Sequence, residues 1–253
     1  MVIFLYHYST PIKQPTSKNL NYLNNPMIGL LIELIISWGL LWLFDKTNLS
    51  VLGIAPIQSR VYYFILGFVV ASAFCALYYG SIASLTGNYF IINKDFTFTL
   101  FLKSSWWTLK SVLFEELIFR GALLYIAIKK LGISKACMIS AIAFGIYHWF
   151  SFGAFGNPVQ MLIIFGMTVI WGLMFAFAYA KTNSLYLPIG IHLGWNLIFN
   201  VVFSKGPLGH QLLISTSDKK LEGIVSLVFF ITQIVFLPIL TYFFLKNKSK
   251  STQ

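Results

Sequence analysis

Two adjacent glutamates and an arginine lie within a long apolar stretch, in the run Phe114-Glu115-Glu116-Leu117-Ile118-Phe119-Arg120-Gly121. A charge at the centre of a membrane helix costs about 2.5–3.5 kcal/mol, so these groups should face an interior or a water-filled cavity. Glu116 and Arg120 are spaced i,i+4 with the acid first, which is the favourable order for an ion pair. Glu115 points about 100° away around the helix. It is therefore the carboxylate left free to act as a general base.

Three more polar residues lie in two later apolar segments. His148 ends the run Phe144-Gly145-Ile146-Tyr147-His148, and His192 and Asn196 lie one helical turn apart on a shared face. Because both can point into one cavity, His192 and Asn196 are candidate donors to a developing oxyanion. His148 could meet Glu115 across the bundle and help to orient or deprotonate a water. Together these residues predict a hydrolase-like site.

Two non-enzymatic interpretations compete with this prediction. Histidine and asparagine often serve as hydrogen-bonding contacts between membrane helices, and for any single residue we favour that role. For the whole set, spread over three helices, we favour function, since intramembrane ionisable residues are functional candidates by default. A proton-relaying transporter is the other alternative, but the sequence has no evident inverted repeat or pair of interrupted helices.

The elements that must position these residues are membrane helices. Of the 253 residues, 58% are hydrophobic and only 10% are charged, and the mean hydropathy is +0.78. A soluble globular domain has a smaller share of hydrophobic residues and a larger share of charged ones. Because about 20 apolar residues cross a bilayer as a helix, we expect an all-α, polytopic transmembrane bundle with the polar site inside it. The seven expected helices are 27–44, 61–85, 105–128, 136–152, 159–180, 185–204 and 222–245.

The chain is strongly basic, with a net charge of +11. Its basic residues are scattered between apolar segments, so we expect them to anchor loops at anionic lipid and expect no nucleic-acid partner. Lysines at 129, 130 and 135 and in the C-terminal tail favour a cytoplasmic location for those regions. Lys-rich, Arg-poor usage is typical of a bacterial chain, which predicts an integral protein of the bacterial plasma membrane. The predicted organisation is an N-terminal tail (1–26), one transmembrane domain (27–245) and a disordered basic tail (246–253).

The order and helical placement of these groups resemble the three motifs of the CAAX protease and bacteriocin-processing (CPBP, or Abi) family of membrane peptidases. The resemblance covers about residues 104–204. The matching patterns are Glu-Glu-x-x-x-Arg at Glu115, Glu116 and Arg120, Phe-x-x-x-His at Phe144 and His148, and His-x-x-x-Asn at His192 and Asn196.

This resemblance implies an intramembrane endopeptidase that acts on a peptide or protein substrate. Glu115 and His148 would activate a water for attack on a peptide carbonyl, and His192 and Asn196 would hold the oxyanion. Bacterial members imply a role in bacteriocin or peptide maturation or in self-immunity. A non-catalytic scaffold or bacteriocin-immunity protein that uses the same polar residues structurally is the alternative. The supporting residues would be Glu116 and Arg120, which set the position and charge of the first motif helix, and Phe144, which packs beneath His148.

A catalytic zinc is an alternative form of the site. Two histidines and a glutamate, here His148, His192 and Glu115, are sufficient ligands for a zinc ion with an open water position. The zinc-protease pattern His-Glu-x-x-His is absent, however, and Glu with His activates water unaided. We therefore expect a site without a metal cofactor. A serine mechanism is less favoured, because Ser151 lies in no recognisable nucleophile motif.

Overall fold

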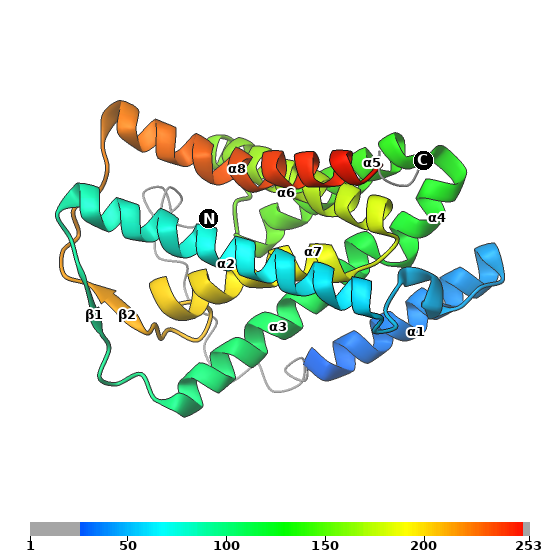
Figure 1. The fold of residues 1–253 in the computed structure, drawn as a ribbon, viewed down its shortest axis with the longest axis horizontal. Helices are drawn as coiled ribbons and strands as arrows, with labels where there is room; N and C mark the ends of the chain where they lie inside the picture. Colours follow the sequence, from blue (N-terminus) through cyan, green and yellow to red (C-terminus); the bar gives the residue numbers. More distant parts are fainter. Residues whose placement is uncertain (1–25, 250–253) are drawn as a thin grey trace.

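The computed structural model describes residues 26–249, which form an elongated helical bundle (Figure 1). The α-helices are α1 (Pro26–Asp45), α2 (Gln58–Thr86), α3 (Phe98–Arg120), α4 (Ala122–Leu131), α5 (Ile133–Ser151), α6 (Pro158–Thr182), α7 (Tyr186–Leu197) and α8 (Gly223–Ser249). A 3-10 turn, Leu49–Leu52, follows α1, and a π-helical segment, Ile198–Phe203, continues α7. The all-α prediction is confirmed.

Every expected helix has a counterpart, but the third is divided into α3 and α4 at Gly121. A Cβ atom at this position would lie 2.1 Å from the carbonyl oxygen of Leu117, so the break depends on glycine. At the other end of the chain, α8 continues to Ser249, into the segment expected to be a disordered tail. The predictions for residues 1–25 and 250–253 lie outside the described residues.

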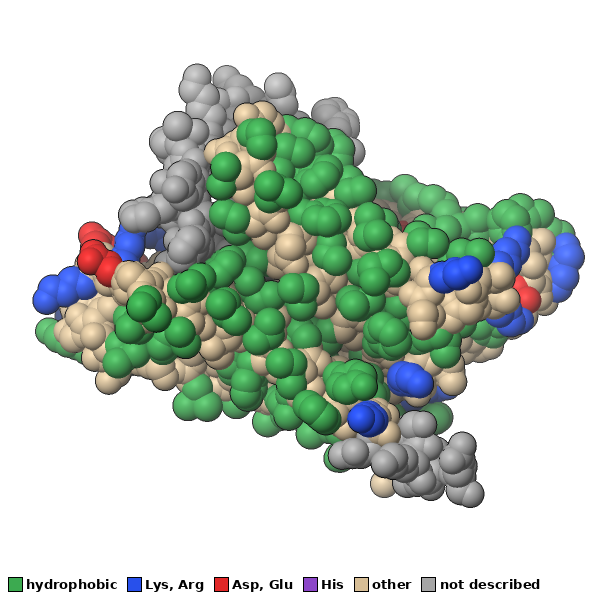
Figure 2. Space-filling view, turned by 90° about the horizontal axis from the view of Figure 1, so that it is seen from above, with side chains coloured by type: hydrophobic (Ala, Val, Ile, Leu, Met, Phe, Trp, Pro, Cys, Tyr) green, Lys and Arg blue, Asp and Glu red, His purple; other side chains and the backbone are tan. Residues whose placement is uncertain are grey.

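Within residues 26–249, six helical segments are long and apolar enough to cross a membrane. They comprise α1, α2, α5, α6, α8, and α7 together with its π-helical extension. Helix α3 is not among them, since its 23 residues include Lys103, Lys110, Glu115, Glu116 and Arg120. Hydrophobic side chains cover the middle of the molecule, and charged side chains gather toward its two ends (Figure 2). These features indicate an integral membrane protein.

The helix that carries two of the predicted site residues, α7, packs closely against α2. A Cβ atom on Gly190 would lie 2.4 Å from the carbonyl oxygen of Phe64, and one on Gly194 would lie 2.4 Å from that of Phe68. The hydroxyl of Ser72 donates a hydrogen bond to the Gly194 carbonyl oxygen at 3.1 Å. Small residues that let backbones approach are a common way to join membrane helices. Here they fix the position of α7 in the bundle.

One end of the bundle carries a short two-stranded ladder. Strands β1 (Phe90–Ile92) and β2 (Leu213–Ser215) pair antiparallel, with Ile91 opposite Ile214. The ladder joins the connection between α2 and α3 to the connection between the π-helical segment and α8 (Figure 1). It therefore holds two segments that are distant in sequence at the same end of the molecule.

Candidate active site

Glu116 forms hydrogen bonds with residues on two helices, α3 and α7. Its carboxylate accepts a hydrogen bond from Arg120 Nε at 2.6 Å and a second bond from Arg120 Nη2, which completes the predicted i,i+4 ion pair. It also accepts a bond from His192 Nδ1, on α7, at 2.7 Å. Glu116 and Arg120 are both fully buried, with no exposed side-chain surface. Arg120 Nη1 has no hydrogen-bond partner among residues 26–249, so the pair is held by the Nε and Nη2 bonds and by the His192 bond.

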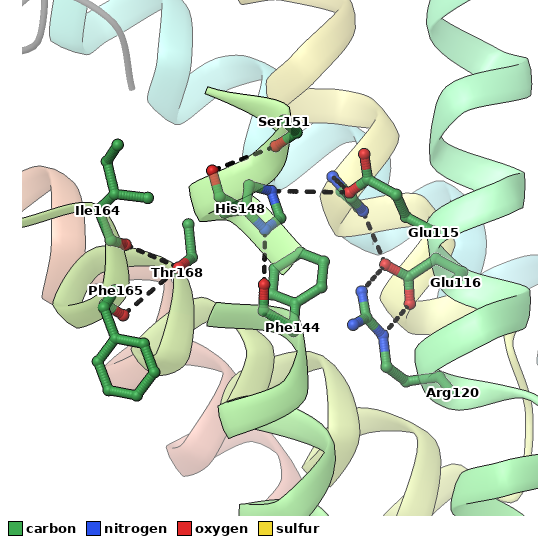
Figure 3. A network of polar contacts seen from close by, with 10 residues as sticks. Glu115, Glu116, Arg120, Phe144, His148, Ser151, Ile164, Phe165 and Thr168 are labelled. Carbon is green, nitrogen blue, oxygen red and sulfur yellow. Dashed lines mark hydrogen bonds and ion pairs between the residues drawn. The ribbon is translucent and has the colours of Figure 1, made fainter. Parts of the chain in front are cut away.

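The tautomers of the two histidines follow from their partners. His148 Nδ1 lies 2.7 Å from the carbonyl oxygen of Phe144 (Figure 3), and His192 Nδ1 lies 2.7 Å from the carboxylate of Glu116. Because carbonyl and carboxylate oxygens accept hydrogen bonds, each Nδ1 carries a proton. The Nε2 atom of each ring is left to face the interior of the site.

Glu115 lies between those two Nε2 atoms. Its Oε2 atom is 3.9 Å from His148 Nε2 (Figure 3). The same oxygen is 3.8 Å from His192 Nε2. That oxygen is buried and has no hydrogen-bond partner among residues 26–249. The Glu115 side chain is 13% exposed, in contrast to the fully buried Glu116. The two adjacent glutamates therefore occupy different environments, one enclosed in an ion pair and one open to a cavity.

Aromatic rings enclose the charged groups. The Arg120 guanidinium lies 4.4 Å from the ring centroid of Phe144 and 5.0 Å from that of Phe175. The Phe175 ring stacks on His192 with a centroid separation of 4.8 Å, and the Phe144 ring contacts His148 edge-on at 4.3 Å. The expected contact between Phe144 and His148 is thus present. These rings restrict the motion of the charged side chains and exclude water from them.

Glu115, His148, His192 and Asn196 line one cavity of about 1620 Å³. Aromatic side chains form much of its wall, including Trp171 and Trp195. Asn196 is half-buried, and its side chain makes no hydrogen bond with another residue in the range 26–249. A large, mostly apolar cavity with a few convergent polar groups is typical of a ligand site. The cavity reaches the end of the bundle that carries the β1–β2 ladder, where the loop 205–222 contributes to its lining.

The structure brings together residues that sequence reasoning did not join. The bond between Glu116 and His192 links α3 to α7, and nothing in the spacing of either motif indicates which helices are neighbours. Asn200 also lines the cavity. The repeated spacing from His192 through Asn196 to Asn200 was a signal that could have identified it. Ser151, the candidate nucleophile that we did not favour, donates its hydroxyl to the His148 carbonyl oxygen at 3.4 Å and contacts no imidazole nitrogen.

Metal ligation was considered for Glu115, His148 and His192. Within residues 26–249, no three His, Cys, Asp or Glu side chains are grouped as they would be to hold a metal ion. The Nδ1 atoms of both histidines are already engaged, by Phe144 and Glu116. Those contacts leave both Nε2 atoms facing Glu115 Oε2, so the absence of a metal cofactor stays a prediction.

Comparison with known proteins gives one match. Residues 97–198 match the family described as type II CAAX prenyl endopeptidase Rce1-like. No curated protein and no solved structure matches the chain. The matched segment contains every residue of the three motifs, from Glu115 in α3 to Asn196 in α7. The part of the chain that carries the three motifs, from α3 to α7, is therefore similar to the type II CAAX prenyl endopeptidase Rce1-like family.

Proposed function

We propose that this protein is an intramembrane endopeptidase in which Glu115 and His148 activate a water and His192 and Asn196 stabilise the oxyanion. The observation that carries the proposal is the position of Glu115 Oε2, which faces His148 Nε2 at 3.9 Å without a hydrogen-bond partner in the described chain. A water between these atoms would donate to both. A carboxylate and an imidazole in this arrangement are suited to general-base catalysis.

In the proposed reaction, Glu115 takes a proton from the water as the water oxygen bonds to the peptide carbonyl carbon. The carbonyl π electrons move to oxygen, which becomes the oxyanion. Asn196 donates to this oxygen through its amide. His192 is placed to do so through Nε2, because its Nδ1 bond to the Glu116 carboxylate orients the ring. Glu115 then returns its proton to the leaving nitrogen as the C–N bond breaks.

The first test uses purified protein in detergent micelles with two internally quenched peptides, one ending in a farnesylated CAAX sequence and one without the lipid. Cleavage by wild type and its loss in Glu115→Gln and His148→Ala would support the mechanism. Undiminished peptide cleavage by the Glu115→Gln variant would refute the role of Glu115 as the base. Comparison of the two peptides tests whether the prenyl group named in the family description is required by this chain.

The proposed site works without a metal ion. Extensive dialysis against a chelator should leave the cleavage rate unchanged, because every step above is performed by side chains. Loss of activity on dialysis, restored by added zinc, would replace this mechanism with a metal-dependent one. Buffer dialysed in parallel without chelator is the control.

We propose further that the natural substrate is a bacteriocin or another peptide that is matured or degraded for self-protection, and that the protein lies in a bacterial plasma membrane. The family resemblance supports this part of the proposal. New peptide termini should be compared in cells that carry wild type, Glu115→Gln or no copy, at matched expression. Termini found only with wild type would identify substrates. Identical termini, with any immunity preserved by Glu115→Gln, would favour a non-catalytic scaffold.

A further inference from the structure

The helix that carries His192 and Asn196 changes its winding just beyond them. Residues Ile198–Phe203 form a π-helix, and Ser204 N–H bonds to the Phe199 carbonyl oxygen, five residues earlier, at 2.9 Å. A π-helix has more residues per turn than an α-helix, so each residue turns by less, and such segments often occur at functional sites. The reduced rotation keeps Asn200 closer to the face of His192 and Asn196 than a continued α-helix would.

Asn200 lines the same cavity as the four predicted catalytic residues. Its side chain is half-buried, and no hydrogen bond joins its carboxamide to another residue in the range 26–249. The neighbouring cavity wall is aromatic, with Trp195, Phe199 and Phe203. The Asn200 carboxamide is therefore free to offer both a donor and an acceptor to a molecule that occupies the cavity.

We propose that Asn200 binds the substrate backbone, by pairing its carboxamide with one peptide unit near the cleaved bond. This inference rests on the proposed peptidase function. A carboxamide offers an N–H donor and a carbonyl acceptor, as a peptide unit does, so the two can form a pair of hydrogen bonds. A peptide that enters an aromatic channel needs such partners, because each unpaired backbone group is penalised there.

The spacing along the helix identifies the peptide unit. Asn200 lies four positions after Asn196, which corresponds to a rise of about 6 Å along the helix. An extended chain advances about 3.3–3.6 Å per residue. If Asn196 holds the oxyanion of the cleaved bond, Asn200 reaches the peptide unit about two residues away. The specificity that results is for an extended backbone at this position, with apolar side chains packed on the aromatic wall.

The test combines variants with modified peptides. Wild type, Asn200→Leu and the control Val202→Ala, in the same π-helical segment but off the cavity wall, are assayed on the quenched peptide that wild type cleaves. Ester analogues replace single backbone N–H groups two residues to either side of the cleaved bond. Asn200→Leu should raise KM about three- to tenfold, which is the effect expected from losing one or two hydrogen bonds to the substrate. The value of kcat should change little. Val202→Ala should match wild type.

The ester at the bound position should raise KM for wild type but have no further effect on Asn200→Leu, since the two changes remove the same interaction. A wild-type KM in Asn200→Leu, or ester and side-chain effects that multiply at every position, would overturn the proposal. If Asn200→Leu does not fold, Asn200→Asp, which keeps the shape but has no amide donor, takes its place. Failure of wild type to cleave any peptide would instead reject the peptidase function itself.

Discussion

Glu116 and Glu115 are chemically identical neighbours whose surroundings separate their roles. Glu116 is enclosed by Arg120 on its own helix and by His192 on α7, with no exposed surface. Glu115 faces the cavity, and one of its oxygens lacks a partner in the described chain. Replacing Glu116 would leave the buried charge of Arg120 without its partner, which is heavily penalised, whereas replacing Glu115 would leave no buried charge unpaired. The two residues should therefore respond differently to the same substitution.

Glu116→Gln should destabilise the fold by about 3–5 kcal/mol, because it leaves the buried Arg120 guanidinium without its counter-charge. Thermal unfolding in micelles measures the change. Glu115→Gln is the matched control: it should unfold near the wild-type temperature while losing peptide cleavage. If the Glu115 variant unfolded early and the Glu116 variant did not, the assignment of structural and catalytic roles would have to be reversed.

At the scale of single elements, the break between α3 and α4 positions the end of the charged helix. Arg120 is the last residue of α3, and Gly121 has a backbone conformation in which a Cβ atom would lie 2.1 Å from the Leu117 carbonyl oxygen. Gly121→Ala must move the backbone of this turn, so we expect a loss of about 1–3 kcal/mol of stability and reduced cleavage. Gly39→Ala, where an added Cβ meets nothing within 4 Å, should leave unfolding and activity unchanged.

The contact between α2 and α7 gives a second prediction at this scale. In Gly194→Ala the new methyl group would lie 2.4 Å from the Phe68 carbonyl oxygen and would force the helices apart. We expect about 1–3 kcal/mol of destabilisation and a larger loss of kcat than of substrate affinity, since His192 and Asn196 move with α7. Gly80→Ala, in an open position of α2, should be neutral or slightly stabilising. Equal behaviour of the two variants would contradict the packing argument.

At the scale of the whole molecule, we expect the two ends of the bundle to lie in different aqueous compartments, because six of the described helical segments are long and apolar enough to cross a membrane. The end of α4 and the C-terminal end of α8 lie at the same end of the long axis, opposite the β1–β2 ladder (Figure 1). In sealed vesicles of one orientation, Lys130→Cys and Lys246→Cys should react with an impermeant thiol reagent from one side, and Lys219→Cys from the other. Cys75 and Cys137 are fully buried and serve as the unreactive background. Labelling of all three variants from one side would contradict the membrane placement.

Much of the arrangement of the site residues could be predicted from the sequence, because it depends on regular helix geometry. The i,i+4 pair of Glu116 and Arg120, and the shared face of His192 and Asn196, depend only on the regular turn of one helix. Contacts between helices depend on tertiary packing, so the bond from Glu116 to His192 could not be predicted. The helix break at Gly121 and the π-helical winding at Asn200 could not be predicted either, because both are departures from regular geometry within apolar runs.

One Glu116 carboxylate serves donors on two helices, and this sharing constrains how the sequence can drift over generations. A lineage that replaced Arg120 alone would leave a buried anion unpaired, and one that replaced His192 would remove one of the three hydrogen bonds to Glu116, so positions 116, 120 and 192 should change together. Position 115 is under no such linkage. Its replacement would leave the charged cluster intact, and the product would be a well-folded descendant that has lost hydrolysis. Non-enzymatic relatives of this protein should therefore be recognisable by the loss of Glu115 with the other three residues retained.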